Sequence, residues 1–315
     1  MNIVFLGTPA FAVPSLRMLA ASRHRVVLAV TRPDRPRGRG LATSPTPVRS
    51  EAERLGIPVE EPATVKDPAV EESLRGRADL FVVASYGEIL TDAFLEIPPK
   101  GCLNLHPSLL PRWRGPSPIP SAILEGDAVT GATVFQIERR TDAGPIFSRR
   151  EVLIGPGEAA PSLFERLALV GAALLVETVD AIEAGTARAV PQDESLVTKS
   201  RKIRKDDGIV RWGSDAVDVA RRVRAFQPWP SAHARLRFSR GPVNLQILEA
   251  RAEPGAGKPG EVLSAGGEGI LVACGTGLLR ILRLKPAARR AMDAASFLRG
   301  HVVRPGDTFE VNDVC

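Results

Sequence analysis

The chain has 315 residues, of which 44% are hydrophobic and 25% charged, and its formal net charge is +6. This composition excludes a largely disordered protein, and no apolar run approaches the roughly 20 residues that a membrane-spanning helix needs. The three cysteines are widely separated and lack a Cys-x-x-Cys pair, which argues against a disulfide framework and a zinc site. Because the N-terminal residues match a strand rather than a signal peptide, we expect a cytoplasmic protein.

The first half of the chain alternates short apolar runs with longer amphipathic segments, the pattern of parallel β-α-β units. Strands are predicted at residues 3–6, 26–30, 80–84, 101–105 and 133–137. Their nearly unbroken apolar composition indicates strands that are buried on both faces. The first turn, Gly7-Thr8-Pro9, lacks the Gly-x-Gly-x-x-Gly spacing that a dinucleotide needs. The sequence therefore predicts a Rossmann-like parallel sheet without a nicotinamide cofactor.

Beyond this sheet the pattern changes twice. Ser162 and Glu165 match a capping box, and the apolar positions that follow predict a helix up to about residue 182. Residues 191–208 are polar, contain five basic residues and have no sustained period, so we interpret them as a linker between domains at 1–190 and 209–315. The second domain is predicted to be a small β-barrel, with a helix at 215–224 and strands at 232–238, 243–250, 269–273 and 278–284.

The net charge is divided unevenly between the two predicted parts of the chain. Residues 1–198 carry 21 Lys and Arg against 24 Asp and Glu, a net charge of −3, whereas residues 199–315 carry 21 against 12, a net charge of +9. Such an excess is often only a solvated surface, but it is also the electrostatic footprint of a protein that binds a polyanion. No long basic amphipathic helix is found, so nucleic acid is favoured over an anionic membrane.

The strongest chemical signal lies in residues 102–115. Side chains two positions apart on a strand point to the same face, so Asn104 and His106 emerge together where the strand enters a loop stiffened by Pro107 and Pro111. Of the four histidines, His106 alone has Asn, Ser, Arg and Trp close to it in the sequence. An amide and an imidazole on one face can hold a reacting carbonyl group, although a histidine at a strand end is more often structural.

This segment, an Asn-x-His pair before Ser-Leu-Leu-Pro, resembles the motif of the folate-dependent N-formyltransferases. The similarity continues in order at residues 5–9, 33–36, 131–133, 141–144 and 224–230, and so covers nearly the whole chain. The resemblance implies a formyltransferase domain followed by an OB-like barrel. It also implies transfer of the formyl group of 10-formyltetrahydrofolate to the α-amino group of methionine on initiator methionyl-tRNA, for translation initiation, by a monomer that does not bind a membrane.

The resemblance assigns the transfer to Asn104, His106 and Asp142. Asn104 would donate a hydrogen bond to the oxyanion of the tetrahedral intermediate, and His106 would do the same or, when protonated, pass a proton to the departing nitrogen. Asp142, the match to the family's aspartate, would hold His106 in the productive tautomer or position a water. Taken alone, Asp142 is typical of an ordinary turn residue close to a glycine.

Two further groups of residues follow from the resemblance. The formyl donor would be bound by Ser108, Leu109, Leu110, Pro111, Tyr86, Ile89 and Leu90. The tRNA would be bound by Arg35, Arg37 and Arg39, from an exposed loop rich in Arg, Pro and Gly, and by Lys202, Arg204 and Lys205 in the linker. Ile89 and Leu90 also fit a helix core, and the arginine loop also fits a merely solvated segment. No His, Asp and Glu cluster has ligand spacing, so no metal is expected.

The chain departs from the family pattern at several positions. Leu41 and Ala42 stand where lysines are common, and Glu138, Arg139 and Arg140 precede Asp142 where small or acidic residues are common. A sugar-nucleotide N-formyltransferase that uses the same folate donor is the nearest alternative, and the basic second half argues against it. More distant alternatives are a folate-dependent dehydrogenase or hydrolase module and a noncatalytic RNA-binding protein.

Overall fold

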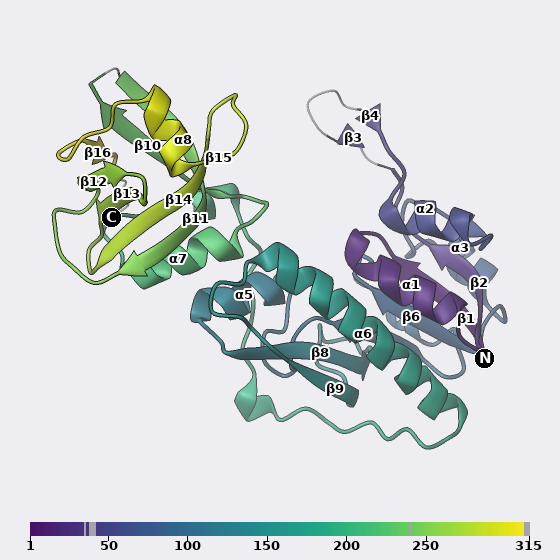
Figure 1. Ribbon diagram of the computed structural model, residues 1–315. Coiled ribbons are helices and arrows are strands. Elements are labelled where there is room, and N and C mark those ends of the chain that lie inside the picture. The colour runs from purple at the N-terminus through teal and green to yellow at the C-terminus, as the bar shows by residue number, and fades with distance from the viewer. Residues whose placement is uncertain (35, 38–41, 240, 312–315) are drawn as a thin grey trace. The chain divides into compact units, whose positions relative to one another are not determined.

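The computed structural model describes residues 1–34, 36–37, 42–239 and 241–311 (Figure 1), with the backbone alone at positions 36, 37, 42 and 43. The chain forms two compact units. One contains residues 1–118, 129–153 and 164–200, and the other contains residues 119–128, 154–163 and 201–315. Among the described residues, no helix is both long and apolar enough to cross a lipid bilayer.

A seven-stranded sheet in the order β5-β2-β1-β6-β7-β8-β9 organises the first unit. Its strands are β1 (Asn2–Gly7), β2 (Arg25–Val30), β5 (Val59–Glu60), β6 (Leu80–Ala84), β7 (Cys102–His106), β8 (Val129–Gln136) and β9 (Ile146–Leu153). The strands from β5 to β7 pair in parallel, and every residue of β6 is buried. The prediction of parallel strands is confirmed for this part of the sheet, and burial on both faces is confirmed most fully for β6.

The prediction of a parallel sheet is wrong for its last two strands. β8 pairs antiparallel with β7, and β9 pairs antiparallel with β8. β9 was not among the predicted strands, because three consecutive polar and exposed residues, 149–151, interrupt its apolar pattern. An edge strand can carry such residues because only one of its sides is paired.

The first unit also contains helices on both faces of the sheet, labelled in part in Figure 1: α1 (Val13–Ala20), α2 (Pro47–Arg54), α3 (Pro68–Leu74), α4 (Asp92–Leu95) and most of α6 (Ala160–Glu183). α6 packs against β7 so closely that a Cβ added at Gly171 would lie 2.9 Å from the Leu105 side chain. α6 begins before the predicted capping box, and the Ser162 hydroxyl donates to Glu158 within the helix start, so that capping prediction is wrong. α5 (Pro118–Glu125) lies between β7 and β8 in sequence.

The arginine-rich segment is separate from the main sheet. β3 (Pro36–Arg37) and β4 (Ala42–Thr43) pair only with each other in the described chain. The sequence predicted a segment too polar to join the sheet, and the main sheet indeed does not include it. Arg35 and Arg39 lie outside the described residues.

The second unit is built on an antiparallel sheet in the order β12-β13-β14-β11-β10-β16, with β15 paired to β14. Its elements are α7 (Ala216–Ala225), β10 (Ala232–Phe238), β11 (Gly241–Glu253), β12 (Val262–Gly266), β13 (Gly269–Ala273), β14 (Leu278–Pro286), β15 (Met292–Asp293), α8 (Ala294–Gly300) and β16 (Thr308–Phe309). A β-bridge between Glu261 and Thr308 joins the two ends of this sheet. The rings of Trp212 and Phe309 pack in its core with centroids 4.7 Å apart. The predicted small β-barrel is confirmed.

Candidate active site

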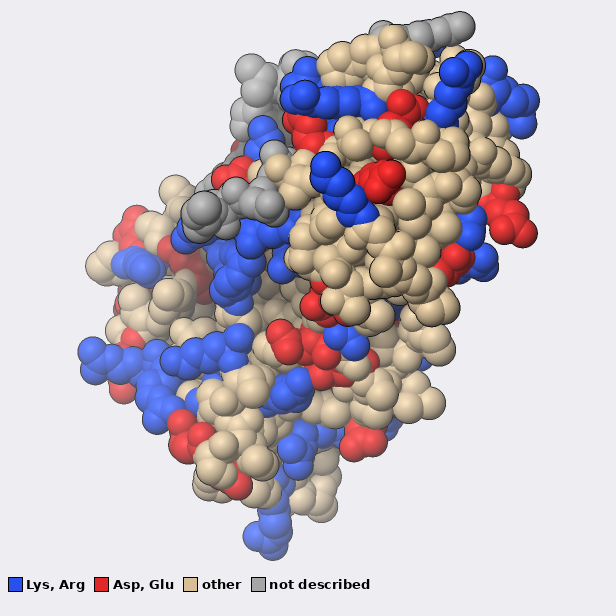
Figure 2. Space-filling view, turned by 90° about the vertical axis from the view of Figure 1, so that its left-hand side faces the viewer, with Lys and Arg blue, Asp and Glu red and all other residues tan. Residues whose placement is uncertain are grey.

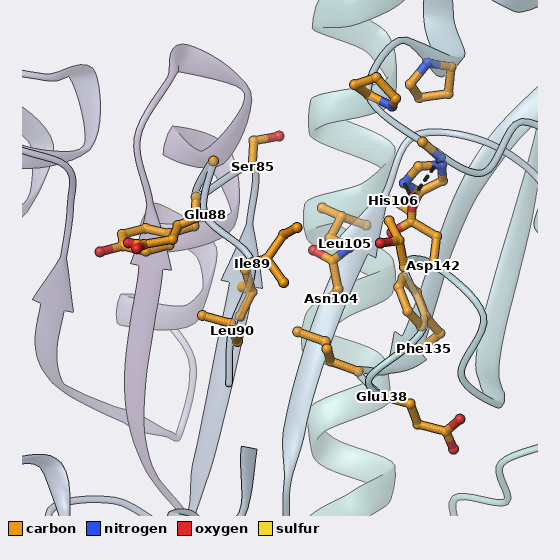
Figure 3. Close-up of a pocket in the computed structure, with 18 of the residues that line it drawn as sticks. Ser85, Glu88, Ile89, Leu90, Asn104, Leu105, His106, Phe135, Glu138 and Asp142 are labelled. Carbon is orange, nitrogen blue, oxygen red and sulfur yellow. Dashed lines mark hydrogen bonds and ion pairs between the residues drawn. The ribbon is translucent and has the colours of Figure 1, made fainter. Parts of the chain in front are cut away.

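A cavity of about 500 Å³ opens beside the carboxyl ends of β6 and β7 in the first unit (Figure 3). Its lining comes from three stretches of the chain, within residues 83–90, 104–118 and 135–142. The carboxyl ends of parallel strands are where open α/β sheets generally bind ligands, because loops rather than packed helices surround them. This cavity is therefore the candidate active site.

Asn104 and His106 both line the cavity, as the alternation of side chains along β7 predicts. Leu105, between them, packs on Gly171 of α6. His106 is 5% exposed, whereas Asn104 is half-buried. Among the described residues, the Asn104 side-chain amide has no hydrogen-bond partner, so its N–H groups are available to a ligand in the cavity.

The hydrogen bonding of His106 determines which ring nitrogen carries the proton in the neutral form. Its Nε2 lies 2.9 Å from the backbone carbonyl oxygen of Trp113. A carbonyl oxygen only accepts hydrogen bonds, so Nε2 must carry a proton and donate it. In the neutral ring, Nδ1 is then the unprotonated nitrogen, and it lies 3.8 Å from Oδ2 of Asp142. Trp113, rather than Asp142, therefore sets the neutral tautomer, which is a correction to the tautomer-holding role considered for Asp142.

Asp142 reaches the cavity from the loop between β8 and β9. Its φ is +53°, a left-handed conformation that aspartate tolerates better than most residues. Oδ2 accepts a hydrogen bond from the backbone N–H of Gly115 at 2.8 Å, and the backbone carbonyl accepts one from the Gln192 side chain at 2.9 Å. Sequence reasoning missed both Gly115 and Gln192 as supports, because neither lies near Asp142 in the chain. Asp142 is thus held at both its carboxylate and its backbone.

The structure places the predicted donor-binding segment 108–111 behind the cavity, because its four residues are not part of the lining. Ser108 is fully buried, and its hydroxyl donates to the Arg112 carbonyl oxygen at 2.6 Å. Leu110 packs with Phe135 and Ile146 in a small core cluster. In this structure the segment shapes the loop that carries the cavity wall, and Pro107 is the neighbour that reaches the cavity itself.

The other predicted donor-binding residues, Tyr86, Ile89 and Leu90, all line the cavity, and Ile89 and Leu90 are labelled in Figure 3. Ile89 is 70% exposed, so it is not the helix-core residue that the alternative interpretation required. Tyr86 is 1% exposed, and burial raises the pKa of its phenol to about 12. Glu88 was missed, although it lies in the same segment. Its carboxylate accepts from Arg32, from the Thr64 hydroxyl and from a backbone N–H, so it fastens this segment to the neighbouring loops.

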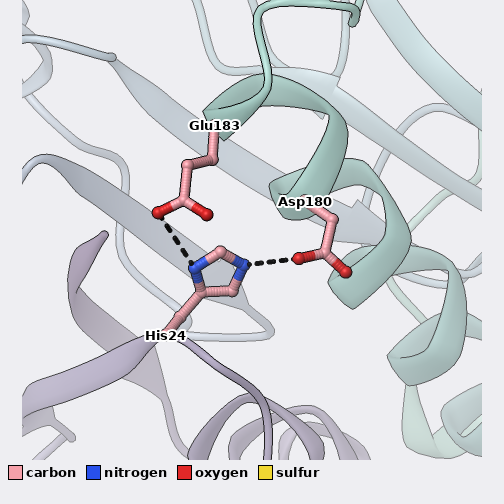
Figure 4. Close-up of side chains that lie close together, drawn as sticks. All are labelled: His24, Asp180 and Glu183. Atoms are coloured by element: carbon pink, nitrogen blue, oxygen red, sulfur yellow. Dashed lines mark hydrogen bonds and ion pairs between the residues drawn. The ribbon is translucent and has the colours of Figure 1, made fainter.

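One grouping in the described chain has the composition of a metal site. His24, Asp180 and Glu183 come from distant segments and place ligand atoms within 4.8 Å of one another (Figure 4). Both carboxylates already pair with the Arg23 guanidinium, at 2.6 Å for Asp180 and 3.1 Å for Glu183. Arg23 therefore already contacts an oxygen of each carboxylate, and the cluster fastens the start of β2 to the end of α6.

The predicted tRNA-binding residues fall into two sets. Of the arginine loop, only the backbone of Arg37 is described. Lys202, Arg204 and Lys205 are exposed, and none of their side chains forms an ion pair with a carboxylate among the described residues, although the backbone N–H of Arg204 donates to Asp207 at 2.7 Å. Arg201, beside them, does pair with Asp207, at 2.6 Å. Figure 2 shows blue Lys and Arg side chains spread over the visible face, with acidic side chains between them.

The fold and the cavity together define a class of protein. In this cavity an amide can stabilise an oxyanion, an imidazole can move a proton and a carboxylate can stabilise positive charge. These functions are typical of an enzyme that transfers an acyl-type group. The formyl transferase family model matches residues 1–179, and the model of the formyl transferase C-terminal domain matches residues 202–302. The chain belongs to the formyl transferase family, and the resemblance in its motifs is confirmed.

Similar proteins extend over nearly the full length of the chain. The methionyl-tRNA formyltransferase of Methylobacterium sp. (strain 4-46) is 43% identical over 307 residues, which cover 97% of this chain and 98% of that protein. The methionyl-tRNA formyltransferase of Methylococcus capsulatus is 45% identical over 305 residues, which cover 96% and 98%.

Solved structures share the fold at lower identity. HypX from Aquifex aeolicus, in complex with tetrahydrofolic acid, has a TM-score of 0.62 and 20% identity, and the match covers 95% of this chain and 47% of that one. The present chain thus spans about half of HypX. WlaRD, a sugar 3N-formyl transferase, has a TM-score of 0.65 and 15% identity over 92% of this chain and 99% of that one.

Proposed function

We propose that this enzyme transfers the formyl group of 10-formyltetrahydrofolate to the α-amino group of methionine on initiator tRNA, in the cytoplasm. The observation that carries the proposal is the 43–45% identity, over nearly the whole of both chains, to proteins named methionyl-tRNA formyltransferase. The products are N-formylmethionyl-tRNA and tetrahydrofolate.

Asn104 acts on the oxygen of the formyl group. Attack of the neutral amine on the formyl carbon moves an electron pair onto that oxygen, and the free amide N–H of Asn104 donates a hydrogen bond to the oxyanion. The amide is half-buried in the cavity wall, where the surrounding dielectric is lower than in water. The same hydrogen bond is weaker to the uncharged carbonyl, so it favours the transition state over the bound substrate.

His106 moves the proton between the two nitrogens. After the attack the amine nitrogen is positively charged, and Nδ1 of His106 is the unprotonated ring nitrogen that can take its proton. The resulting imidazolium faces the Asp142 carboxylate at 3.8 Å, which stabilises the positive charge. The imidazolium then donates this proton to the folate nitrogen as the bond from that nitrogen to the formyl carbon breaks. Asp142 takes no part in the proton transfer itself and acts through its negative charge.

The tRNA is held by the basic part of the chain. Lys202, Arg204 and Lys205 are exposed cations whose side chains have no carboxylate partner in the described chain, and residues 199–315 carry a net charge of +9. We assign them, with Arg35, Arg37 and Arg39, to phosphate contacts. Because such contacts release counterions, affinity for the tRNA falls as salt is added.

An amino-sugar nucleotide is the second candidate substrate, because WlaRD shares the fold. The basic second half favours the tRNA, since a sugar nucleotide presents far fewer phosphates. The test is transfer of labelled formyl from 10-formyltetrahydrofolate to charged initiator tRNA, to charged elongator tRNA and to a dTDP-amino sugar. Transfer to the initiator tRNA at the highest kcat/KM supports the proposal, and preferential transfer to the sugar nucleotide overturns it.

A further inference from the structure

Residues 191–200, which we call the strap, lie along the loop that follows β7. The backbone N–H of Arg114 donates to the Thr198 carbonyl at 3.0 Å, and the N–H of Ser200 donates to the Arg114 carbonyl at 2.7 Å. The N–H of Thr198 donates in turn to the Pro111 carbonyl at 3.3 Å. The strap belongs by its contacts to the first unit, and the chain enters the second unit immediately after it.

The side chain of Gln192 joins the strap to the loop that carries Asp142. Its amide nitrogen donates to the backbone carbonyls of Asp142 at 2.9 Å and Gly144 at 2.7 Å. Its amide oxygen accepts from Nε and Nη2 of Arg114, at 3.0 and 2.8 Å. A glutamine amide has two N–H donors and two acceptor sites, and here all four are used. The orientation of the amide is therefore fully determined by its partners.

These contacts close a ring around Asp142. Gln192 holds the backbone of Asp142 and the guanidinium of Arg114, and the residue after Arg114 is Gly115, whose N–H donates to the Asp142 carboxylate. The Arg114 side chain is only 7% exposed and also pairs with Glu194 at 3.0 Å, so burial and this ion pair hold its guanidinium in place. A left-handed φ such as that of Asp142 persists only where the surroundings hold it.

We infer that Gln192 is a positioning residue for the transfer reaction, which holds Asp142 so that its carboxylate faces Nδ1 of His106. The inference rests on the proposed function and adds a residue from the segment between the two domains to the catalytic apparatus. Gln192 itself touches no reacting atom. Its loss should therefore lower the rate of the chemical step and leave the binding of both substrates nearly unchanged.

The decisive variant is Gln192→Glu, which has the same size and still accepts from Arg114 but presents a carboxylate oxygen to the Asp142 and Gly144 carbonyls. We expect kcat to fall by about 10- to 100-fold, the scale of a catalytic group displaced by about 1 Å, with both KM values changed less than twofold. Asp193→Asn is the matched control: it lies next in the strap, keeps its cap on the Ser195 N–H and makes no contact with Asp142. Its kcat should equal that of the wild type.

A double-mutant cycle separates positioning from simple stabilisation. In an Asp142→Asn background, Gln192→Glu should change the single-turnover rate less than twofold, because the group that it positions no longer carries charge. An equal loss in both backgrounds, or no loss in the wild-type background, overturns the inference. If Gln192→Glu does not fold, as judged by its melting temperature, Gln192→Met takes its place. Absence of transfer to charged tRNA by the wild type would instead overturn the proposed function.

Discussion

Replacing Asn104 by alanine should abolish most of the catalytic rate without disturbing the fold. Asn104 lies in the middle of β7, where its backbone pairs with β6 and β8 and where alanine can adopt the same conformation. Its side-chain amide is half-buried and has no hydrogen-bond partner among the described residues. Truncation therefore leaves no buried group unpaired, and we expect the free energy of unfolding to change by about 1 kcal/mol or less.

The catalytic loss follows from the hydrogen bond to the oxyanion. Removing one preorganised donor from an acyl-transfer site costs about 2 to 4 kcal/mol of transition-state stabilisation, which corresponds to a fall of about 30- to 900-fold in kcat. Asn104→Asp, which keeps the shape but replaces the N–H donors by a negative charge, should lose at least as much. Both variants should bind the substrates with KM values within a few-fold of the wild type, because the oxyanion forms only during the reaction.

The assay is the single-turnover rate of formyl transfer to charged initiator tRNA at saturating 10-formyltetrahydrofolate. Asn2→Ala, an exposed asparagine of β1, controls for the substitution itself and should retain the full rate. A rate for Asn104→Ala within threefold of the wild type would refute the oxyanion role. So would a large rise in KM with an unchanged rate, since that result assigns the amide to substrate binding alone.

Three further outcomes follow from the same structure. His106→Ala should lose about 2 to 4 kcal/mol in the transition state, and a pre-steady-state rate close to that of the wild type would exclude the proton transfer. Replacing Lys202, Arg204 and Lys205 together by alanine should reduce the slope of log affinity for tRNA against log salt by about 2 to 3 in filter binding, whereas an unchanged slope would place the phosphate contacts elsewhere. Hydrogen bonds from Arg54 and Arg17 lower the pKa of Glu51 from 4.5 to about 2, so its share of stability is present above pH 4.5 and is lost as pH falls towards 2. The melting temperature of Glu51→Gln should accordingly fall less than that of the wild type between these pH values, and equal falls would contradict the linkage.

The periodicity of the sequence was sufficient to predict those features of the fold and of the site that depend on a single strand. The two-residue spacing of Asn104 and His106 predicted that they share a face, and both line the cavity. The unbroken apolar runs predicted strands buried on both faces, as in β6. These features follow from local geometry, which a short window of sequence contains.

Features that depend on distant partners were not predictable in the same way. The neutral tautomer of His106 is set by a backbone carbonyl of the following loop, and a carbonyl oxygen has no signature in the sequence. The antiparallel edge of the sheet escaped prediction because β9 carries exposed charges in its centre. The support of Asp142 by Gln192 spans 50 residues and crosses a segment that looks like a polar linker by composition alone.

The contrast between strand and loop also explains how the chain tolerates its departures from the family pattern beside Asp142. Charges at Arg139 and Arg140 precede this residue in sequence, yet both side chains are exposed, and Arg140 pairs with Glu194 at 2.7 Å. The conformation of Asp142 depends instead on hydrogen bonds from Gly115 and Gln192, which do not involve the residues before it. A loop that is fixed by distant partners can change its neighbouring side chains without moving its carboxylate. Hydrogen bonds from distant residues therefore hold Asp142 in place, whereas the pairing of β7 with its neighbouring strands holds Asn104.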